Sequence, residues 1–168
     1  FITIPAGIDT IPYQAFSGCE CLKNISLPVS AQNLEQYAIY GCKGLKRLNF
    51  KNVTNPNSQA ISGNYVIREI VVNSDVTYIP NYFCSDCIGL EKVSFLGKIK
   101  MLYSGTFSGC YSIKTVDLTH CVSVPTLQDN SLYSSARSDL EILVPADLAD
   151  EWKSATNWVN VASYIKGV

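Results

Sequence analysis

Residues 11–28 read IPYQAFSGCECLKNISLP, and the apolar, cysteine and glycine spacing of this stretch recurs along the chain. The spacing returns 23 residues later in residues 34–50, and again in the pair of segments 79–95 and 102–118. Residues 61–72 keep the apolar spacing but carry Asn64 where the other copies have cysteine, so this coil is expected to be the weakest. A fixed period of this length indicates a repeat architecture.

Each copy contains two apolar residues separated by one position, which is the alternation of a short half-buried strand. The seven pairs are Ile2/Ile4, Ile25/Leu27, Leu48/Phe50, Ile70/Val72, Val93/Phe95, Val116/Leu118 and Ile142/Val144. Stacked in register, they predict parallel strands about 4.8 Å apart. We therefore predict a strand-rich α/β fold, namely a right-handed solenoid of about seven coils, each of 23 residues, with only short helical turns on the far wall.

Such a stack needs caps, because one coil alone cannot offset the entropy of ordering its backbone. At the C-terminal end Pro145 follows the last apolar pair, and Leu148, Trp152 and Ala155 share one face of a short helix. Residues 1–145 are thus interpreted as the solenoid and 146–168 as the cap of the same domain, with both tryptophans in its core. The chain opens inside a repeat, so we expect further coils upstream.

Composition excludes several functions. Charged residues make up 16% of the chain, and 13 basic against 14 acidic residues give a net charge of −1, which argues against nucleic-acid binding. No apolar run approaches the ~20 residues that a membrane-spanning helix needs.

The string in residues 11–28 resembles the BspA-like leucine-rich repeats of bacterial surface proteins. The tail, from Ile142-Leu143-Val144-Pro145 to Trp158 and Ile165, is similar to the closing segment of such proteins; residues 51–64 and 119–139 depart from the pattern. The resemblance implies an extracellular or cell-envelope protein, often of a host-associated bacterium, used in adhesion and protein–protein contact. It implies no catalytic residue and no cofactor, and the expected partner is a host or bacterial surface protein.

The seven cysteines fall into two groups. Four of them (Cys19, Cys42, Cys87 and Cys110) share one repeat position, which predicts an inward-facing ladder of free thiols, although a ladder spacing near 5 Å also permits disulfides. Cys84 and Cys87 form a Cys-x-x-Cys, a pattern typical of redox or zinc sites, but Cys84 aligns with the core residues Phe16 and Phe107. Cys21 and Cys121 lie outside the ladder and are expected to be the most reactive or paired thiols.

Catalysis is not expected. His120 is the only histidine and is interpreted as a surface or turn residue, and no phosphate-binding loop or metal-binding histidine pair occurs. Asp139 and Glu141 could share one strand face, but nothing supplies the opposing acid of a hydrolytic site.

Binding is expected on the strand face. A charged column (Lys23, Lys46, Arg68, Glu91 and Lys114) precedes the predicted strands, and outward strand positions lie beside it. The candidate partner-binding residues are Lys23, Lys46, Arg47, Arg68, Glu69, Lys92 and Lys114. Two interpretations stay open: a solvated rim that keeps the sheet soluble, or a site where Lys23, Lys46 and Arg68 contact an acidic host protein or glycan.

Ten tyrosines, including Tyr13, Tyr37, Tyr40, Tyr82, Tyr103 and Tyr111, suggest an alternative function. Exposed rings on the turns could stack against sugars in a carbohydrate-binding module, although tyrosine is also often half-buried in ordinary surfaces. Residues 52–59, rich in Asn, Pro and Ser, are expected to be the most mobile exposed segment.

Overall fold

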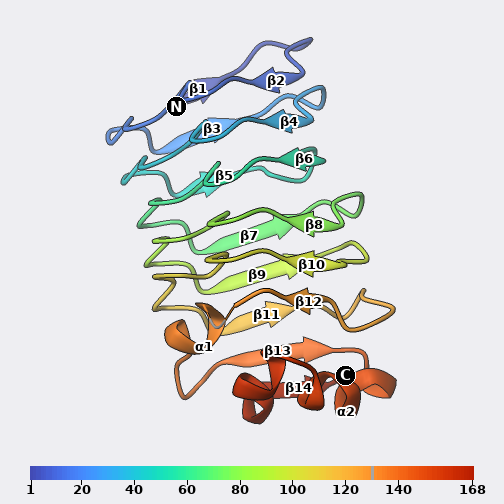
Figure 1. Cartoon of the computed structure of the whole chain (residues 1–168). Helices are drawn as coiled ribbons and strands as arrows, with labels where there is room; N and C mark the ends of the chain where they lie inside the picture. Colours follow the sequence, from blue (N-terminus) through green and yellow to red (C-terminus); the bar gives the residue numbers. More distant parts are fainter. Residues whose placement is uncertain (130) are drawn as a thin grey trace.

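The predicted apolar pairs lie in or beside short strands that stack in parallel down one side of the molecule (Figure 1). The computed structural model describes residues 1–129 and 131–168. This first sheet column comprises β1 (Ile2–Thr3), β3 (Asn24–Ser26), β5 (Arg47–Leu48), β7 (Glu69–Val72), β9 (Lys92–Phe95), β11 (Thr115–Asp117), β13 (Glu141–Val144) and β14 (Ile165–Gly167). Ile25 pairs with Leu48, and Val93 pairs with Val116. The predicted solenoid with one parallel strand per coil is therefore confirmed.

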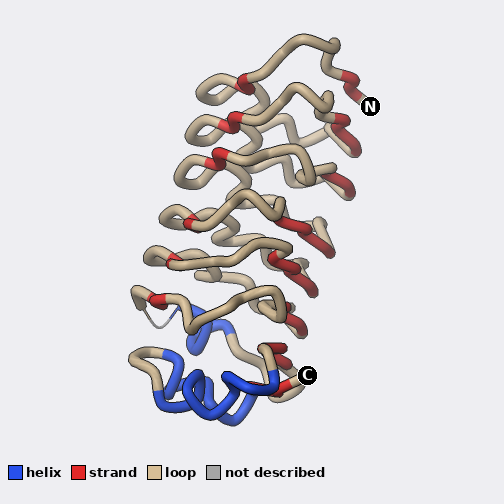
Figure 2. Tube along the Cα trace, turned by 90° about the vertical axis from the view of Figure 1, so that its right-hand side faces the viewer, coloured by secondary structure: helices blue, strands red, loops and turns tan. Residues whose placement is uncertain are grey.

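A second column of strands was not predicted. It comprises β2 (Thr10–Ile11), β4 (Asn33–Leu34), β6 (Asn55–Pro56), β8 (Tyr78–Ile79), β10 (Met101–Leu102) and β12 (Thr126–Leu127). Each of these strands has two residues, which is too short to show an alternating pattern. The two columns run along different sides of the stack (Figure 2).

The third wall is built from stacked turns. Successive turns are joined by backbone hydrogen bonds between coils, such as Phe16 N–H to the Ala38 carbonyl at 2.8 Å and Gly18 N–H to the Tyr40 carbonyl at 2.8 Å. Gly18 and Gly41 have φ of 70° and 65°, the left-handed region that residues with a Cβ adopt only at a cost. The glycines before Cys19, Cys42 and Cys110 are thus explained by backbone geometry, and Asp86 adopts the same left-handed conformation before Cys87.

Apolar side chains from all three walls meet in one continuous core. Phe50 packs edge-on against Phe83 with ring centroids 5.3 Å apart, and Phe95 packs in the same way against Phe107 at 6.4 Å. Each of these pairs joins a residue of the first sheet column, or of the segment that follows it, to a residue of the turn wall. The core is therefore shared between coils, as a stack of individually unstable units requires.

The C-terminal segment closes the stack as expected (Figure 1). It contains η1 (Ala146–Leu148), α2 (Ala149–Ser154) and η2 (Trp158–Tyr164), while α1 (Ser131–Ser135) lies earlier in the chain. Trp152 and Trp158 are fully buried with ring centroids 4.7 Å apart, so their predicted core role is confirmed. Beyond the expectation, β14 adds a last strand beside β13.

Both sheet columns are interrupted at one level. Among the described residues, β1-β3-β5 form a sheet separate from the five strands β7, β9, β11, β13 and β14, and β2-β4-β6 are separate from β8-β10-β12. The turn wall continues across the interruption, because Gly41 N–H donates to the Ser62 carbonyl at 2.9 Å and Gly63 N–H to the Ser85 carbonyl at 2.8 Å. Among the described residues, the backbone hydrogen bonds across this level therefore lie in the turn wall, and the Asn73 side chain donates one further bond to the Lys51 carbonyl.

Two local features occur at this interruption. The segment that joins β5 to β6 is one residue shorter than the segment that joins β3 to β4, because Leu48 and Pro56 take the places that Ile25 and Leu34 occupy one coil earlier. In the second column, the residue after each strand donates its N–H to the previous coil, as Asn57 does to the Leu34 carbonyl at 2.8 Å. Pro80 occupies this position after β8 and has no N–H to donate.

The departing segments have local structure of their own. Residues 52–59, expected to be the most mobile exposed segment, are not exposed throughout: they contain β6 and the buried Val53. The N–H groups of Thr54 and Asn55 both donate to the Gln32 carbonyl at 3.0 Å. Within residues 119–139 lie β12 and α1, and position 130 lies outside the described residues. The two segments that depart from the repeat pattern therefore remain part of the stack, although their backbone differs from that of the regular coils.

Candidate functional site

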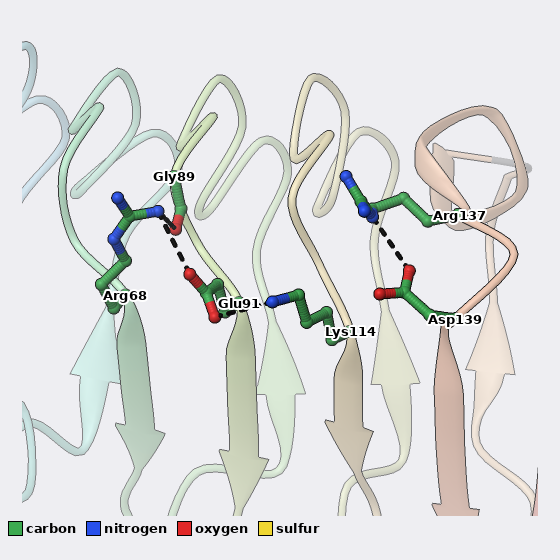
Figure 3. Close-up of polar contacts among 6 residues, drawn as sticks. All are labelled: Arg68, Gly89, Glu91, Lys114, Arg137 and Asp139. Carbon is green, nitrogen blue, oxygen red and sulfur yellow. Dashed lines mark hydrogen bonds and ion pairs between the residues drawn. The ribbon is translucent and has the colours of Figure 1, made fainter.

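The charged column lies where each coil enters its strand of the first sheet, and its members Arg68, Glu91 and Lys114 come close enough to interact (Figure 3). Glu91 is the centre of its downstream half. It accepts from Arg68 Nη1 at 3.3 Å through Oε1 and from Lys114 Nζ at 3.1 Å through Oε2. Arg68 also donates to the Gly89 carbonyl at 3.0 Å. The predicted residues Arg68 and Lys114 are thus held by one carboxylate.

The neighbouring column of outward strand positions is also paired downstream of the interruption. Lys92 Nζ lies 3.7 Å from Glu69 Oε1 across β7 and β9, and Lys166 pairs with Glu141 across β13 and β14. All of these side chains are substantially exposed, so each pair stabilises the fold only weakly. Their main effect is to leave few uncompensated charges on this half of the face.

Asp139 and Glu141 have separate partners. Arg137 Nε donates to Asp139 Oδ1 at 2.9 Å (Figure 3), and this hydrogen bond lowers the pKa of the Asp139 carboxyl below its ordinary value. Glu141 is engaged by Lys166 instead. Asp139 and Glu141 therefore each form an ordinary surface ion pair with a different cation.

Upstream of the interruption the cations differ. Lys23, Lys46 and Arg47 are exposed, and within the described part of the chain none of them takes part in an ion pair. The nearby pair of Lys43 with Glu20, at 2.6 Å, involves neither the column nor the strand positions. The seven predicted residues therefore divide into a paired group (Arg68, Glu69, Lys92 and Lys114) and an unpaired group (Lys23, Lys46 and Arg47).

The interruption between β5 and β7 forms a cleft on this face, which we call the β5/β7 cleft. Residues 46–51 line one wall, and Arg68, Glu69 and Val71 line the other. Its volume is ≈ 480 Å³. Lys51, which also lines it, was not among the predicted residues, although the 22-residue step from Leu48 to Ile70 marks the place in the sequence.

The cysteine ladder is confirmed for three of its four members. Cys42, Cys87 and Cys110 are buried, and each thiol donates to a carbonyl of the preceding coil, for example Cys42 Sγ to Phe16 O at 3.0 Å and Cys87 Sγ to Ile61 O at 3.3 Å. Cys19 is only half-buried, and all seven cysteines are free thiols. Burial raises the pKa of Cys42 to about 11.

Cys84 and Cys87 show no sign of redox or metal chemistry. Both are fully buried, and burial raises the pKa of both thiols above the ordinary value, which is the opposite of an activated thiolate. No cluster of three or more potential metal-ligating side chains occurs among residues 1–129 and 131–168. The packing interpretation of the Cys-x-x-Cys is therefore confirmed.

The expectation for Cys121 is wrong. Cys21 is exposed as predicted, but Cys121 is buried, with 3% of its surface accessible. Burial raises the pKa of Cys121 to about 11. The reason is that Cys121 occupies the buried position after the strand that Val53, Val76 and Ile99 occupy in the earlier coils.

The single histidine and the tyrosines lie on the surface of the stack. His120 is exposed and lies in a turn as expected. Tyr13, Tyr37 and Tyr40 form a small cluster on the turn wall, with ring centroids 6.0 Å apart between the first two and 5.3 Å between the last two. Tyr13 is the most exposed of the three. In this cluster the tyrosine rings of neighbouring coils pack edge-to-face against one another.

Comparison with known proteins identifies the repeat. Residues 1–114 match six copies of the BspA type leucine rich repeat region. The chain belongs to the BspA-type leucine-rich repeat family. Repeat domains of this family are typically non-enzymatic binding modules for other proteins, and the family is typically associated with bacterial surfaces. No helix in the described part of the chain is long and apolar enough to cross a membrane.

A solved structure supports the fold of this BspA-type chain. A crystal structure of a leucine-rich repeat protein from Bacteroides ovatus ATCC 8483 is similar with a TM-score of 0.56 and 21% sequence identity. The match covers 85% of this chain and 47% of the Bacteroides protein, so the chain spans about half the length of that protein. No functionally curated protein is similar in sequence.

Proposed function

We propose that this BspA-type repeat is a non-enzymatic adhesion module of a secreted or cell-surface bacterial protein, and that it binds a host or bacterial surface protein through the exposed face of the first sheet. The observation that carries the proposal is the split of the charged face. Downstream cations are compensated by Glu91 and Glu69, whereas Lys23, Lys46 and Arg47 are exposed and have no ion-pair partner among the residues that the structure describes. Uncompensated charge on a rigid face supports recognition of a partner of opposite charge.

The solenoid provides the rigidity that such a face needs. Strand positions one coil apart are fixed in register by backbone pairing, as Asn24 is with Arg47 and Thr115 with Lys92. The side chains on this face are therefore presented with little freedom of the backbone, which lowers the entropy cost of binding. Extended faces of stacked repeats are commonly used in this way.

The experiment is a binding screen with the whole chain. Immobilised protein is exposed to a panel of extracellular-matrix proteins and, separately, to a glycan panel. We expect saturable binding to a protein, and we expect the reversal variant Lys23→Glu/Lys46→Glu/Arg47→Glu to abolish it. Unchanged affinity of this variant would place the binding site elsewhere on the molecule.

A carbohydrate-binding module is the second candidate, and the cluster of Tyr13, Tyr37 and Tyr40 is the observation that favours it. Exposed aromatic faces can stack on sugar rings, and this cluster lies on the turn wall, away from the charged column. Binding confined to the glycan panel and lost in Tyr13→Ala, with the charge variants unaffected, would favour this candidate over the first.

A further inference from the structure

The β5/β7 cleft combines charge with an interrupted backbone ladder. Three of the cations on its first wall, Lys46, Arg47 and Lys51, have no ion-pair partner within the described part of the chain. On the opposite wall Glu69 is engaged by Lys92 and Arg68 by Glu91. The cleft is therefore strongly cationic in a chain whose net charge is −1.

One backbone carbonyl in the cleft, that of Lys46, lacks the hydrogen bond that its equivalents accept, as judged on the described residues. The carbonyls of the charged column accept an N–H from the next coil: Lys23 O from Lys46, Arg68 O from Glu91, and Glu91 O from Lys114, each at 2.8 Å. Lys46 breaks this series, because its carbonyl receives no such bond from β7 or its neighbours in the described chain. The cleft thus presents a carbonyl acceptor together with three unpaired cations.

These features select one class of occupant. A strand edge with open acceptors binds main-chain N–H groups, which an extended polypeptide supplies at regular intervals. Cations beside that edge favour carboxylates on the same polypeptide. The half-buried Leu48 and Val71 in the walls provide apolar contact. A sulfated sugar or a lipid headgroup would match the charge but would not place a main-chain N–H beside the Lys46 carbonyl.

We propose that the β5/β7 cleft binds an extended acidic segment of a protein partner, whose carboxylates contact Lys46, Arg47 and Lys51 and whose main chain donates to the Lys46 carbonyl. This inference rests on the proposed function, since it assigns the place and the chemistry of the protein contact. It also gives the interruption a role, because the coil after β5 leaves the Lys46 carbonyl open to the partner.

The test measures fluorescence anisotropy of a labelled peptide with the whole chain. The probe has about eight residues that alternate Glu and Thr, so that the carboxylates lie on one side of an extended strand. A Gln/Thr peptide controls for charge, and a Glu/Thr peptide N-methylated at alternate amides controls for main-chain donors. We expect the Glu/Thr peptide to bind, the Gln/Thr peptide not to bind, and N-methylation to weaken binding at least about threefold.

Two triple variants locate the site. Lys46→Glu/Arg47→Glu/Lys51→Glu should weaken binding at least about tenfold. The matched control, Lys98→Glu/Lys100→Glu/Lys153→Glu, changes the net charge equally at exposed positions outside the cleft and should change affinity less than about twofold. If the cleft variant does not fold, as judged by circular dichroism, amide shifts in the wild-type chain decide: changes at residues 46–51 and 68–71 support the proposal, and changes elsewhere overturn it.

Other outcomes overturn the proposal. These are absence of peptide binding, an equal loss in both triple variants, or tighter binding of a sulfated oligosaccharide at the same residues. The proposed function fails separately, if no protein of the panel binds. A panel protein whose binding depends on Lys92 and Lys114 but not on Lys46, Arg47 and Lys51 would leave the proposed function intact and overturn only the assignment to the cleft.

Discussion

Asn64 Oδ1 accepts a hydrogen bond from the Cys42 N–H at 3.0 Å, and both residues are fully buried. Asn64 Nδ2 donates to the carbonyls of Ile39 at 2.8 Å and Ile61 at 2.6 Å. The bond to Ile39 corresponds to the thiol-to-carbonyl bond of the ladder cysteines, and the other two are additional. The coil without a ladder cysteine therefore carries the more extensively hydrogen-bonded side chain at that position.

Replacement of Asn64 is consequently expected to be costly. Asn64→Ala leaves the Cys42 N–H and the Ile39 carbonyl without their partner inside the core, and we expect the free energy of unfolding to fall by about 2–4 kcal/mol. Urea denaturation of the whole chain measures this. Cys87→Ala, which loses a single thiol donor at the equivalent position, is the matched control and should cost less. A loss below about 0.5 kcal/mol for Asn64→Ala would contradict the assigned role.

Native thiols should react in an order set by exposure. Cys21 is exposed and Cys19 half-buried, whereas Cys42, Cys84, Cys87, Cys110 and Cys121 are buried. We expect iodoacetamide at pH 8 to label Cys21 first, then Cys19, and the remaining five only on unfolding, because the thiolate is the reactive species. Peptide mass spectrometry over time reports the order. Labelling of Cys121 as fast as Cys21 would be inconsistent with the structure.

Alkaline pH should destabilise the fold through its buried thiols. Burial raises the pKa of Cys121 from 9.0 to about 11. Between these two values the unfolded chain loses the thiol proton while the folded chain keeps it, so unfolding becomes more favourable as pH rises. The stabilising effect is complete below pH 9.0 and is lost toward pH 11. We expect the unfolding free energy of the wild type to fall more steeply across this window than that of Cys121→Ala; parallel curves would argue against it.

The downstream ion pairs should matter little for stability. Glu91→Gln removes the carboxylate shared by Arg68 and Lys114, but the three side chains are 40–63% exposed. We therefore expect a loss of no more than about 1 kcal/mol, and we expect it to vanish at roughly 1 M salt. Thermal unfolding at low and high salt gives the comparison, with Lys98→Gln as an unpaired surface control.

Much of this architecture follows from the period of the sequence. A step of 23 residues with an apolar-x-apolar pair in each copy specifies which residues become neighbours, as Ile25 and Leu48 do. The second strand column could not be predicted in the same way, because Thr10–Ile11 and its equivalents are too short for alternation and are defined by pairing between coils. Its hydrogen bonds are therefore visible only once the stack is formed.

The candidate site was predictable in part for a related reason. The column positions of Lys46 and Arg68 follow directly from the period, and so do their neighbours: Lys46 lies between the cations Lys23 and Arg68, whereas Arg68 lies next to Glu91. For Arg47 the interruption matters, because Glu69, one coil further on, is paired with Lys92 instead. The interruption coincides with a shorter segment between Leu48 and Pro56 and with a proline at position 80. Both features are present in the sequence. Their effect on strand pairing can be recognised only when the hydrogen-bond partners of each coil are known.

The two buried tryptophans of the C-terminal segment allow one interaction to be measured against an internal control. Trp158 Nε1 donates to the Pro125 carbonyl at 2.7 Å and so ties the last turns to the segment before β12. Trp152 Nε1 is equally buried but has no hydrogen-bond partner among residues 1–129 and 131–168. Phenylalanine at either position removes a similar apolar volume. The difference in unfolding free energy between the two variants therefore isolates the contribution of the hydrogen bond to Pro125.

We expect Trp158→Phe to be more destabilising than Trp152→Phe by at least about 1 kcal/mol, because only the first leaves a buried carbonyl unpaired, while the second removes an unsatisfied N–H. Urea unfolding of both variants, followed by circular dichroism because the substitutions change the tryptophan fluorescence, measures the difference. Since the two rings pack against each other, the double variant Trp152→Phe/Trp158→Phe tests their coupling. Equal losses in the two single variants would show that the bond to Pro125 contributes nothing to closing the stack.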